Sequence, residues 1–212
     1  MSDLKKIGVV DYGSGNLHSV TKSLEAAGAS PLLVTQSSQL DEIDAVVVPG
    51  QGSFGDCSRN LRASGMWDAV SEWVRADRPY LGICLGYQLL FESSEESPGT
   101  KGLAIFEGHV TRFTDPTLKI PHMGWNELTD TKGPLFEGMG ALPHFYFVHS
   151  YFPAPQDADL VSAYCDYGGK FAASISRGAV HATQFHPEKS QASGQALLRN
   201  FLSSLNAPAT SH

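Results

Sequence analysis

The chain has 212 residues, of which 42% are hydrophobic and 17% charged, so we expect one globular domain with a substantial core rather than a disordered chain. The net charge is −7 and the lysines and arginines do not cluster, which argues against nucleic acid as a partner. Three dispersed cysteines indicate free thiols in the cytoplasm rather than disulfides, and no signal peptide or apolar run of about 20 residues points to a membrane.

Short apolar strands alternate with amphipathic helices through the first half of the chain. The strands are predicted at residues 7–10, 45–48 and 79–81. The helices are predicted at 17–27, ended by Gly28, then as one helix across 61–74, and at 87–91. This alternation is typical of an α/β fold with a mostly parallel central sheet and flanking helices.

The second half is rich in predicted strands and ends in one helix. The strands are expected at 104–113, 124–128, 145–152, 160–167, 171–176 and 179–185, and the helix at 193–205. Because no linker or repeat separates the halves, we expect this part to add an antiparallel β region to the same domain, spanning 1–206. Residues 207–212 are small or polar and are predicted to be a flexible C-terminal tail.

Cys84 lies between two glycines in Gly82-Ile83-Cys84-Leu85-Gly86, where a predicted strand passes directly into a predicted helix. Such a sharp turn needs small neighbours and exposes its central side chain at the top of the sheet. The N–H groups at a helix start also favour negative charge, and the thiolate is the reactive form of cysteine. Cys84 is therefore the candidate nucleophile, although free cysteines are more often simply packed in a core.

A candidate base and its orienting group occur in Gln184-Phe185-His186-Pro187-Glu188. If a strand runs to residue 185, His186 and Glu188 project to the same side, so the carboxylate can hold one imidazole nitrogen. An isolated His-x-Glu is commonly a surface pair, and only its combination with Cys84 favours catalysis. In α/β-hydrolases the acid precedes the histidine, so the order found here disfavours a thioesterase-like hydrolase.

Acyl chemistry on an amide also needs hydrogen-bond donors for the developing oxyanion. The backbone N–H of Leu85, directly after the nucleophile, is one candidate. The turn Gly50-Gln51-Gly52 could supply the second, although alone it would be an ordinary strand-end turn. Gln88 lies one helical turn beyond Cys84 on the same face, close to the expected site.

Other chemistries find less support in the sequence. The glycine-rich loop at 13–16 lacks the full dinucleotide-binding pattern, and the eight histidines show no paired metal-ligand spacing. We therefore expect no cofactor and no metal. Cys57 and Cys165 have neither flanking glycines nor a helix start, and we expect them to be structural.

The motifs around Cys84 and His186 together resemble those of class I glutamine amidotransferases, whose flavodoxin-like fold the resemblance implies. Within that family, the chain is similar to the glutaminase subunits of imidazole glycerol phosphate synthase. That finer resemblance is carried by Pro121-His122-Met123-Gly124-Trp125-Asn126, Tyr146-Phe147-Val148-His149-Ser150-Tyr151 and Pro187-Glu188-Lys189-Ser190. It extends over nearly the whole chain, and the first of these stretches is the most specific.

The resemblance implies roles for particular residues. Cys84, His186 and Glu188 would form a catalytic triad that hydrolyses L-glutamine through a thioester, with Leu85, Gln51 and Gly52 at the oxyanion. Glutamine would be held by Gly52, Gln88, Glu96, His149, Ser150 and Tyr151. Contacts to a partner are expected from Trp125, Asn126, Tyr146 and Lys189.

The implied partner is a cyclase subunit, a (βα)8 barrel similar to HisF, in a heterodimer. The ammonia would pass to it for synthesis of imidazole glycerol phosphate and aminoimidazole carboxamide ribonucleotide in histidine biosynthesis. The isolated chain is then expected to be nearly inactive until its partner binds.

Two positions depart from the family pattern. Gln51 stands where valine is usual, which leaves open how the oxyanion turn switches, and Tyr87 replaces a common methionine, which affects packing. Two alternatives remain: the glutaminase of another amidotransferase, such as pyridoxal phosphate synthase or anthranilate synthase, and a non-catalytic binding module of the same fold.

Overall fold

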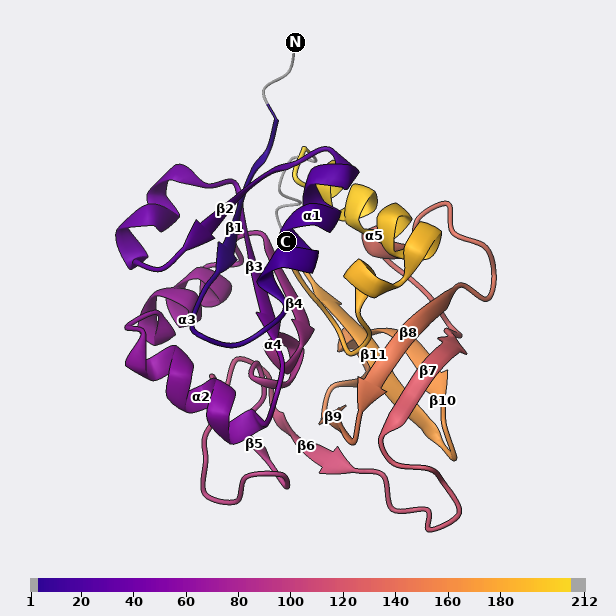
Figure 1. The fold of residues 1–212 in the computed structure, drawn as a ribbon. Helices are drawn as coiled ribbons and strands as arrows, with labels where there is room; N and C mark the ends of the chain where they lie inside the picture. The colour runs from indigo at the N-terminus through magenta and orange to yellow at the C-terminus, as the bar shows by residue number, and fades with distance from the viewer. Residues whose placement is uncertain (1–3, 207–212) are drawn as a thin grey trace.

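A seven-stranded sheet forms the centre of the computed structural model, which describes residues 4–206 (Figure 1). Its strand order is β10-β11-β12-β4-β3-β1-β2. Strands β2, β1, β3, β4 and β12 run parallel to one another, and β11 and β10 continue the sheet in antiparallel pairing. The strands are β1 (Lys6–Val10), β2 (Ser30–Val34), β3 (Ala45–Gly50), β4 (Tyr80–Cys84), β10 (Val161–Asp166), β11 (Lys170–Arg177) and β12 (Val180–Thr183). The predicted α/β fold with an added antiparallel region is confirmed.

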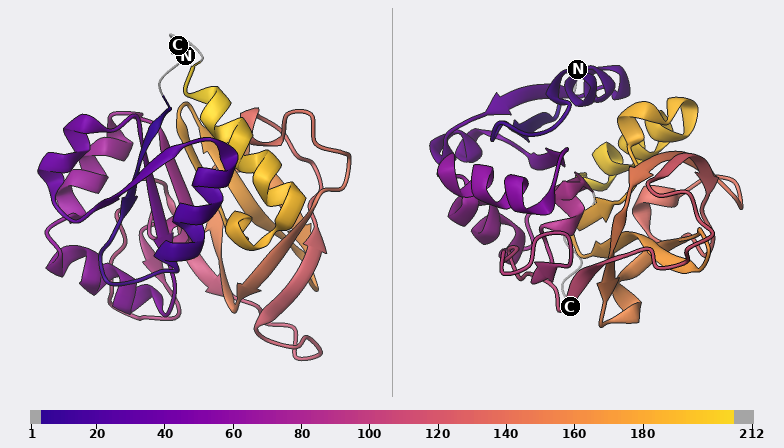
Figure 2. Two further views of the ribbon diagram at one scale, coloured as in Figure 1. Left: turned by 45° about the horizontal axis from the view of Figure 1, so that its top comes forward. Right: turned by 60° about the horizontal axis from the view of Figure 1, so that its bottom comes forward.

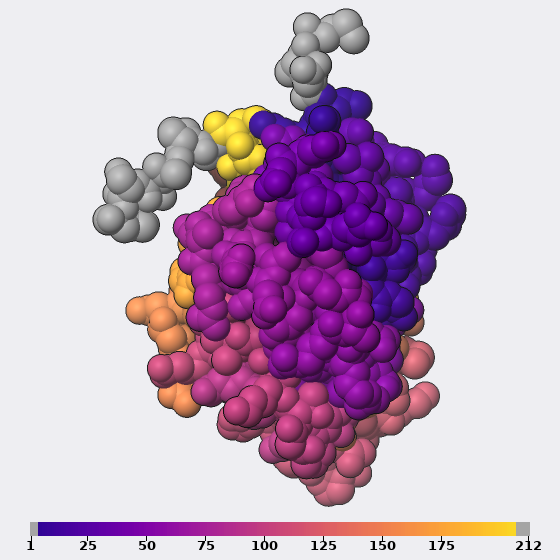
Figure 3. Space-filling model, turned by 90° about the vertical axis from the view of Figure 1, so that its left-hand side faces the viewer, coloured from indigo at the N-terminus to yellow at the C-terminus, as the bar shows by residue number. Residues whose placement is uncertain are grey.

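Helices cover both faces of this sheet. The first helix, α1 (Leu17–Ala27), lies beside the last, α5 (Gln191–Ser204), on one face (Figures 1 and 2). The other face is covered by α2 (Phe54–Ala63) and α3 (Trp67–Arg75). Figure 3 views the side of α2 and α3, where the N-terminal half, in indigo to magenta, forms most of the surface. Opposite faces follow from the right-handed crossovers, because the chain leaves β1 and β3 in opposite directions along the sheet.

Two smaller sheets lie beside the central one. One contains β5 (Ser93–Ser94), β6 (Gly108–Arg112) and β9 (Tyr151–Pro155). The other pairs β7 (His122–Glu127) with β8 (His144–His149) in antiparallel register. Short helices complete the described chain: α4 (Leu85–Gln88), η1 (Ser37–Glu42), η2 (Pro134–Phe136), η3 (Ala158–Leu160) and η4 (Pro187–Lys189).

The predicted apolar runs form the central strands, where residues on both faces of the sheet are buried. Every residue of β3 and β4 is buried, as expected for central parallel strands between helical layers. By contrast, β2 lies outside the predicted strands. It is an edge strand that contains Pro31 and exposes Leu32 and Leu33, so its sequence shows neither alternation nor a fully apolar run.

Two helix predictions were wrong in extent. The helix expected across 61–74 is two helices, because Gly65 has φ = +75° and turns the chain between α2 and α3. The helix expected at 87–91 is the single turn α4, which begins at Leu85 and ends at Gln88. The final helix begins at Gln191, two residues before the predicted start.

Three strand predictions also change. The predicted strand 145–152 is two strands, broken at Ser150, because β8 pairs with β7 whereas β9 pairs with β6. Leu160 ends the short helix η3 rather than beginning β10. The predicted strand 179–185 ends at Thr183, so Phe185 and His186 follow it. The predicted tail at 207–212 lies outside the described residues.

Candidate active site

Cys84 ends β4 in a strained backbone conformation, with φ = 55° and ψ = −104°. The turn is tight: a Cβ on Gly82 would lie 2.6 Å from the Gly86 carbonyl oxygen, and one on Gly86 would lie 1.8 Å from the Val48 carbonyl oxygen. Both glycines are therefore required by close backbone approach. A strained residue held between rigid elements is typical of a functional position.

The thiol of Cys84 is less accessible than expected. The residue is only 3% exposed, whereas the sequence pattern predicted an exposed cysteine. Because α4 is a single turn packed on β3, Leu85 and the following residues cover the end of β4. Cys84 still reaches solvent through a small pocket, described below, that it lines.

His186 and Glu188 form a buried pair beside this turn. His186 Nδ1 lies 2.8 Å from Glu188 Oε1, and each side chain is only 2% exposed. They lie near Cys84 because β12 runs parallel to β4, with Thr183 opposite Ile83, so both chain segments leave the sheet at the same edge. The predicted reason for the pairing was wrong, since both residues follow β12. Glu188 lies in η4 and folds back onto the ring.

Neighbouring backbone fixes this segment. His186 N–H donates to the Tyr146 carbonyl oxygen at 2.9 Å. The Ser190 hydroxyl donates to the His186 carbonyl oxygen at 2.7 Å and accepts from Tyr146 N–H at 2.9 Å. Strand β8 thus holds the position of His186 relative to the sheet.

The electrostatic surroundings favour a charged imidazole. Burial lowers the pKa of His186, but charge and hydrogen-bond interactions with Cys84 and Glu188 outweigh the effect of burial and raise the pKa to about 10. Nε2 is buried and has no conventional hydrogen-bond partner among the described residues. This nitrogen is therefore free to exchange a proton with a bound ligand or with the thiol.

Two glutamine side chains connect the thiol to the rest of the pocket. Gln184 Nε2 approaches Cys84 Sγ at 3.6 Å and its Oε1 accepts from Gln88 Nε2 at 3.2 Å. Gln88 Nε2 also donates to the Tyr151 carbonyl oxygen at 3.0 Å. Within the described chain, Gln88 Oε1 is buried without a partner. A buried carbonyl oxygen of this kind is suited to accept an N–H from a ligand.

A pocket of about 160 Å³ opens directly at Cys84. Every residue predicted to hold the substrate lines it: Gly52, Gln88, Glu96, His149, Ser150 and Tyr151. Cys84 and Leu85 also line it, as do Pro121 and Val148, which lie in motifs that carried the resemblance but were given no role in binding. Its size suits a ligand of about ten non-hydrogen atoms rather than a nucleotide, since drug-sized sites occupy about 300–1,000 Å³.

Glu96 is held at one end of this pocket. Its Oε2 accepts from Phe54 N–H, the first residue of α2, at 2.7 Å. A carboxylate at a helix N-terminus is stabilised by the unpaired N–H groups and the helix dipole. Glu96 therefore presents a fixed negative charge to the pocket, where a ligand ammonium group could bind.

The turn after β3 does not present the Gln51 N–H to the pocket. That N–H points to Ser14 Oγ at 3.4 Å, and the Gln51 carbonyl oxygen accepts from the Ser14 hydroxyl at 2.6 Å and from Cys57 Sγ at 3.5 Å. Gly52 lies at φ = +99° and lines the pocket. Ser14 of the glycine-rich loop therefore holds this turn through both backbone groups of Gln51.

Three of the four predicted partner-contact residues form one surface. Trp125 lies opposite Tyr146 across the β7–β8 pair, with ring centroids 6.3 Å apart, and is 47% exposed. Lys189 Nζ lies 5.9 Å from the Tyr146 ring. Asn126 differs, because its amide is used internally: Nδ2 donates to the Asp166 carbonyl oxygen at 3.0 Å and contacts His122 Nε2 at 3.3 Å.

The other singled-out residues lie in the core. Tyr87 is fully buried and its hydroxyl donates to the Ala172 carbonyl oxygen at 3.3 Å, which ties α4 to β11. Cys57 and Cys165 are buried free thiols. Burial raises the pKa of both, that of Cys165 to about 12, so neither resembles a reactive thiol.

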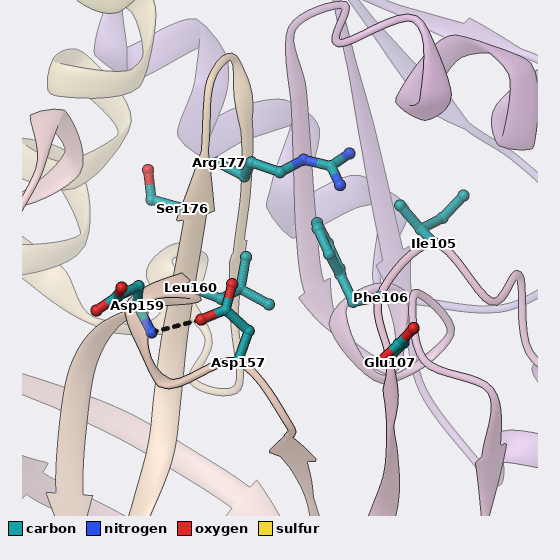
Figure 4. A pocket seen from close by; sticks show the side chains of 8 residues that line it. All are labelled: Ile105, Phe106, Glu107, Asp157, Asp159, Leu160, Ser176 and Arg177. Carbon is teal, nitrogen blue, oxygen red and sulfur yellow. Dashed lines mark hydrogen bonds between the residues drawn. The ribbon is translucent and has the colours of Figure 1, made fainter.

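A wider pocket of about 440 Å³ lies elsewhere on the molecule (Figure 4). Arg177 extends over Phe106, and Asp157 and Asp159 lie across from them. Arg177 pairs with Val180, and Val180 with Tyr80, so this pocket is at the opposite end of β4 from Cys84. No nucleophile and base are paired among its lining residues, and volume alone does not make it the reactive site.

Sequence patterns missed three residues that shape the site: Ser14, His122 and Gln184. Gln184 and His122 belong to the motifs that carried the resemblance, but their contacts depend on strand pairings that the sequence does not specify. In the described part of the chain, no three His, Cys, Asp or Glu side chains are grouped as metal ligands. Nor does any described helix have the length and hydropathy needed to cross a membrane.

Comparisons with known proteins agree with this geometry. A sequence model of the family described as glutamine amidotransferase class-I matches residues 8–205. The chain is 48% identical to imidazole glycerol phosphate synthase subunit HisH of Chromobacterium violaceum, covering 93% of this chain and 97% of that protein. The corresponding subunit of Methylococcus capsulatus is 47% identical, with 94% and 96% covered.

Solved structures agree at the level of the fold. A crystal structure of a glutamine amidotransferase superposes with a TM-score of 0.74 at 22% identity, covering 95% of this chain and 99% of that one. The structure of PurLQS from Thermotoga maritima has a chain that superposes with the same TM-score at 18% identity, covering 96% and 100%.

Proposed function

Because this chain belongs to the class-I glutamine amidotransferase family, we propose that it is the glutaminase subunit of an imidazole glycerol phosphate synthase and hydrolyses L-glutamine to glutamate and ammonia. The observation that carries the proposal is that the strained Cys84, which lines a small pocket, also interacts with the buried His186–Glu188 pair. The size and charge of that pocket suit an amino acid.

The first chemical step is attack of the Cys84 sulfur on the side-chain amide carbon of glutamine. The S–C bond forms, the C–N bond breaks, and a glutamyl thioester remains on Cys84. His186 donates the proton that the leaving nitrogen needs, and its raised pKa means that it carries this proton at neutral pH. Glu188 keeps Nδ1 as the donor side of the ring, so Nε2 is directed to the reaction.

The second step removes the glutamyl group. His186, now neutral, accepts a proton from water through Nε2 while the water oxygen attacks the thioester carbon. The S–C bond breaks, glutamate leaves, and the thiolate–imidazolium pair is restored. Leu85 N–H, the first after the nucleophile, supplies one oxyanion donor.

Substrate recognition follows from two fixed groups. The Glu96 carboxylate, held by the start of α2, pairs with the α-ammonium group of glutamine. Gln88 Oε1, buried and without a partner in the described chain, accepts a further ligand N–H. The backbone from His149 to Tyr151 forms the remaining wall.

The second oxyanion donor requires a change in the turn at Gly50–Gly52. The Gln51 N–H is directed to Ser14, so it must turn toward Cys84 before it can bind an oxyanion. We expect the isolated chain to be slow for this reason, and the partner to favour the active turn. The proposed partner is the cyclase subunit, a (βα)8 barrel in a heterodimer, which receives the ammonia for imidazole glycerol phosphate and aminoimidazole carboxamide ribonucleotide synthesis.

The cyclase is proposed to bind over Trp125, Tyr146 and Lys189, which lie next to the His186 segment. The exposed Trp125 and the half-buried Tyr146 lie beside the Lys189 cation, and aromatic residues are enriched at protein interfaces. Asn126 lies at the edge of this surface, and its contribution is indirect. The proposed location is the cytoplasm, whose reducing conditions keep the Cys84 thiol free.

Substitution of the nucleophile tests the proposal in the two-chain complex. In Cys84→Ala, synthesis from glutamine should fall by at least about a thousandfold, since no thioester can form. Synthesis from added ammonia should continue, because the cyclase does not need Cys84. Both rates are followed by formation of imidazole glycerol phosphate.

Cys165→Ala is the matched control, since it removes a buried thiol from β10, away from the pocket. It should leave both activities in place. Loss of the ammonia-dependent rate in Cys84→Ala would show that Cys84 is structural. Failure of the two chains to associate would exclude the proposed partner.

A further inference from the structure

Two buried histidines lie directly behind the glutamine pocket. His122 of β7 and His149 of β8 are paired across the strands, and their side chains meet with His122 Nδ1 3.1 Å from His149 Nε2. They are only 3% and 6% exposed. His149 lines the pocket, whereas His122 is one layer further from it.

Backbone carbonyls at both ends of this pair fix the direction of its hydrogen bonds. At one end His149 Nδ1 lies 2.9 Å from the Tyr151 carbonyl oxygen, so Nδ1 must carry the proton. A neutral His149 then has a lone pair on Nε2. That nitrogen accepts from His122 Nδ1–H, and His122 Nε2 is left as an acceptor.

The other end of the chain agrees with this assignment. Asn126 Nδ2 lies 3.0 Å from the Asp166 carbonyl oxygen, which fixes it as the amide nitrogen. Its second proton points to His122 Nε2 at 3.3 Å. Each donor therefore meets an acceptor in the order Asn126, His122, His149 and the Tyr151 carbonyl.

Both rings are held neutral and in place. Burial lowers the pKa of His122 to about 4 and that of His149 to about 3. A proton on His149 Nε2 would face His122 Nδ1–H, so two donors would meet and the hydrogen bond between the rings would be lost. The His122 ring cannot turn freely, because it is stacked between Phe147 and Tyr167 at centroid distances of 4.7 and 4.0 Å.

The Tyr151 carbonyl oxygen connects the histidine pair to the pocket. It accepts from both His149 Nδ1–H and Gln88 Nε2–H. The second contact fixes which end of the Gln88 amide is nitrogen and leaves Oε1 as the unpaired acceptor. If His149 lost its Nδ1 proton, its lone pair would repel the carbonyl and release the anchor of Gln88.

We propose that His122 is a positioning residue for the glutamine pocket: in a one-directional chain of hydrogen bonds that begins at Asn126, it donates to His149 Nε2 and so, together with the Tyr151 carbonyl, holds the Nδ1–H tautomer of His149 and the orientation of Gln88. The proposal rests on the proposed function for its kinetic consequence, but the tautomer assignment does not depend on any activity. His122 and Asn126 touch no reacting atom. Their role is to set which groups of the pocket donate and which accept.

Nitrogen-15 NMR of the ring nitrogens tests the tautomers in the isolated full chain. His122 and His149 should both be neutral with the proton on Nδ1. In Asn126→Asp, a side chain of the same size that cannot donate, the proton of His122 should move to Nε2. A wild-type His149 protonated on Nε2, or an unchanged His122 in Asn126→Asp, would overturn the proposal whether or not the chain is a glutaminase.

Steady-state kinetics of the complex with the cyclase test the consequence. His122→Leu should raise KM for glutamine about tenfold, the effect of losing about one hydrogen bond, with a smaller change in kcat. His122→Asn keeps a donor close to the Nδ1 position and should recover most of the loss. Equal damage in both variants, or none in either, would overturn the positioning role.

His181→Leu is the matched control for removal of a buried histidine. His181 lies on β12 and contacts Ser176 and Phe201 rather than the pocket. The KM of His181→Leu for glutamine should equal that of the wild type. A tenfold rise in this control would show that the His122→Leu result reflects loss of core packing rather than loss of the hydrogen bond. A wild-type complex without glutaminase activity would reject the proposed function and leave the tautomer result standing.

Discussion

His186 has to be both a buried side chain and a charged one. Its side chain is 2% exposed, which alone would favour the neutral form, yet charge and hydrogen-bond interactions with Cys84 and Glu188 raise its pKa to about 10. The charge is therefore stable only inside this group of three. The role of His186 as proton donor to leaving ammonia depends on this raised pKa. The contribution of Glu188 to the pKa can be tested by a substitution that removes its carboxylate.

Glu188→Gln should lower the pKa of His186 by removing one of its anionic neighbours. The amide can still accept from Nδ1–H, so the ring should stay in place while kcat/KM for glutamine falls about a hundredfold. Because a raised pKa keeps the ring protonated up to about pH 10 in the wild type, the alkaline loss of activity should begin at lower pH in the variant.

A pH profile of kcat/KM in the two-chain complex provides the measurement. Glu72→Gln, which makes the same change on exposed surface of α3, should match the wild type. A profile of Glu188→Gln with an unshifted alkaline limb would show that Glu188 does not set the charge of His186.

At the scale of elements, the site depends on how closely α4 packs on β3 and β4. The strained backbone of Cys84 persists because the turn cannot relax: Gly86 contacts the Val48 carbonyl, and the Tyr80 hydroxyl donates to the Gly86 carbonyl oxygen at 2.9 Å. The glycines predicted to flank a sharp turn are needed for the packing of that turn against two strands. A side chain at residue 86 has no space.

Gly86→Ala should destabilise the protein by about 3 kcal/mol, since its Cβ would fall 1.8 Å from the Val48 carbonyl oxygen and the backbone must move. Denaturant unfolding at neutral pH provides the measurement. Gly140→Ala is the matched control, because Gly140 is exposed and its Cβ would meet nothing within 4 Å. Equal stability of the two variants would show that α4 is not tightly packed.

At the scale of the whole molecule, three buried histidines with lowered pKa values make the free energy of unfolding depend on pH. Burial lowers the pKa of His122 and His181 to about 4 and that of His149 to about 3. Between about pH 4 and the ordinary value of 6.5, the unfolded chain binds these protons and the folded chain does not. The free energy of unfolding must therefore fall as the pH drops through this window.

His181→Asn should reduce that slope by about 1.4 kcal/mol per pH unit, the contribution of one proton, while the amide can still bond Ser176. Denaturant titrations at several pH values from 4 to 8 measure the slope. Near pH 8 the ring is neutral in both states, so the two proteins should differ there by a constant amount. Parallel curves down to pH 4 would contradict the assignment.

Local sequence determined the elements whose causes are local. The apolar run at 45–48 had to be a buried strand, Gly82 and Gly86 had to flank a sharp turn, and the motifs around Cys84 and His186 indicated the family. One local signal was missed, since Gly65 divides one amphipathic stretch into α2 and α3. The break between β8 and β9 at Ser150 could not be read locally, because it arises from the pairing of β9 with β6 and of β8 with β7.

By itself, therefore, the sequence determined the fold class and the residue types of the candidate site, because hydrophobic periodicity and glycine placement act within a few residues. Only the tertiary structure decided which atoms meet. His186 lies beside Cys84 because β12 runs parallel to β4, Glu188 reaches it from η4 rather than along a strand, and His122 faces His149 because β7 pairs with β8. Some of those contacts join residues 27 or more positions apart, and the Glu188 contact depends on where β12 ends. The packing of the whole chain sets both, and local sequence does not.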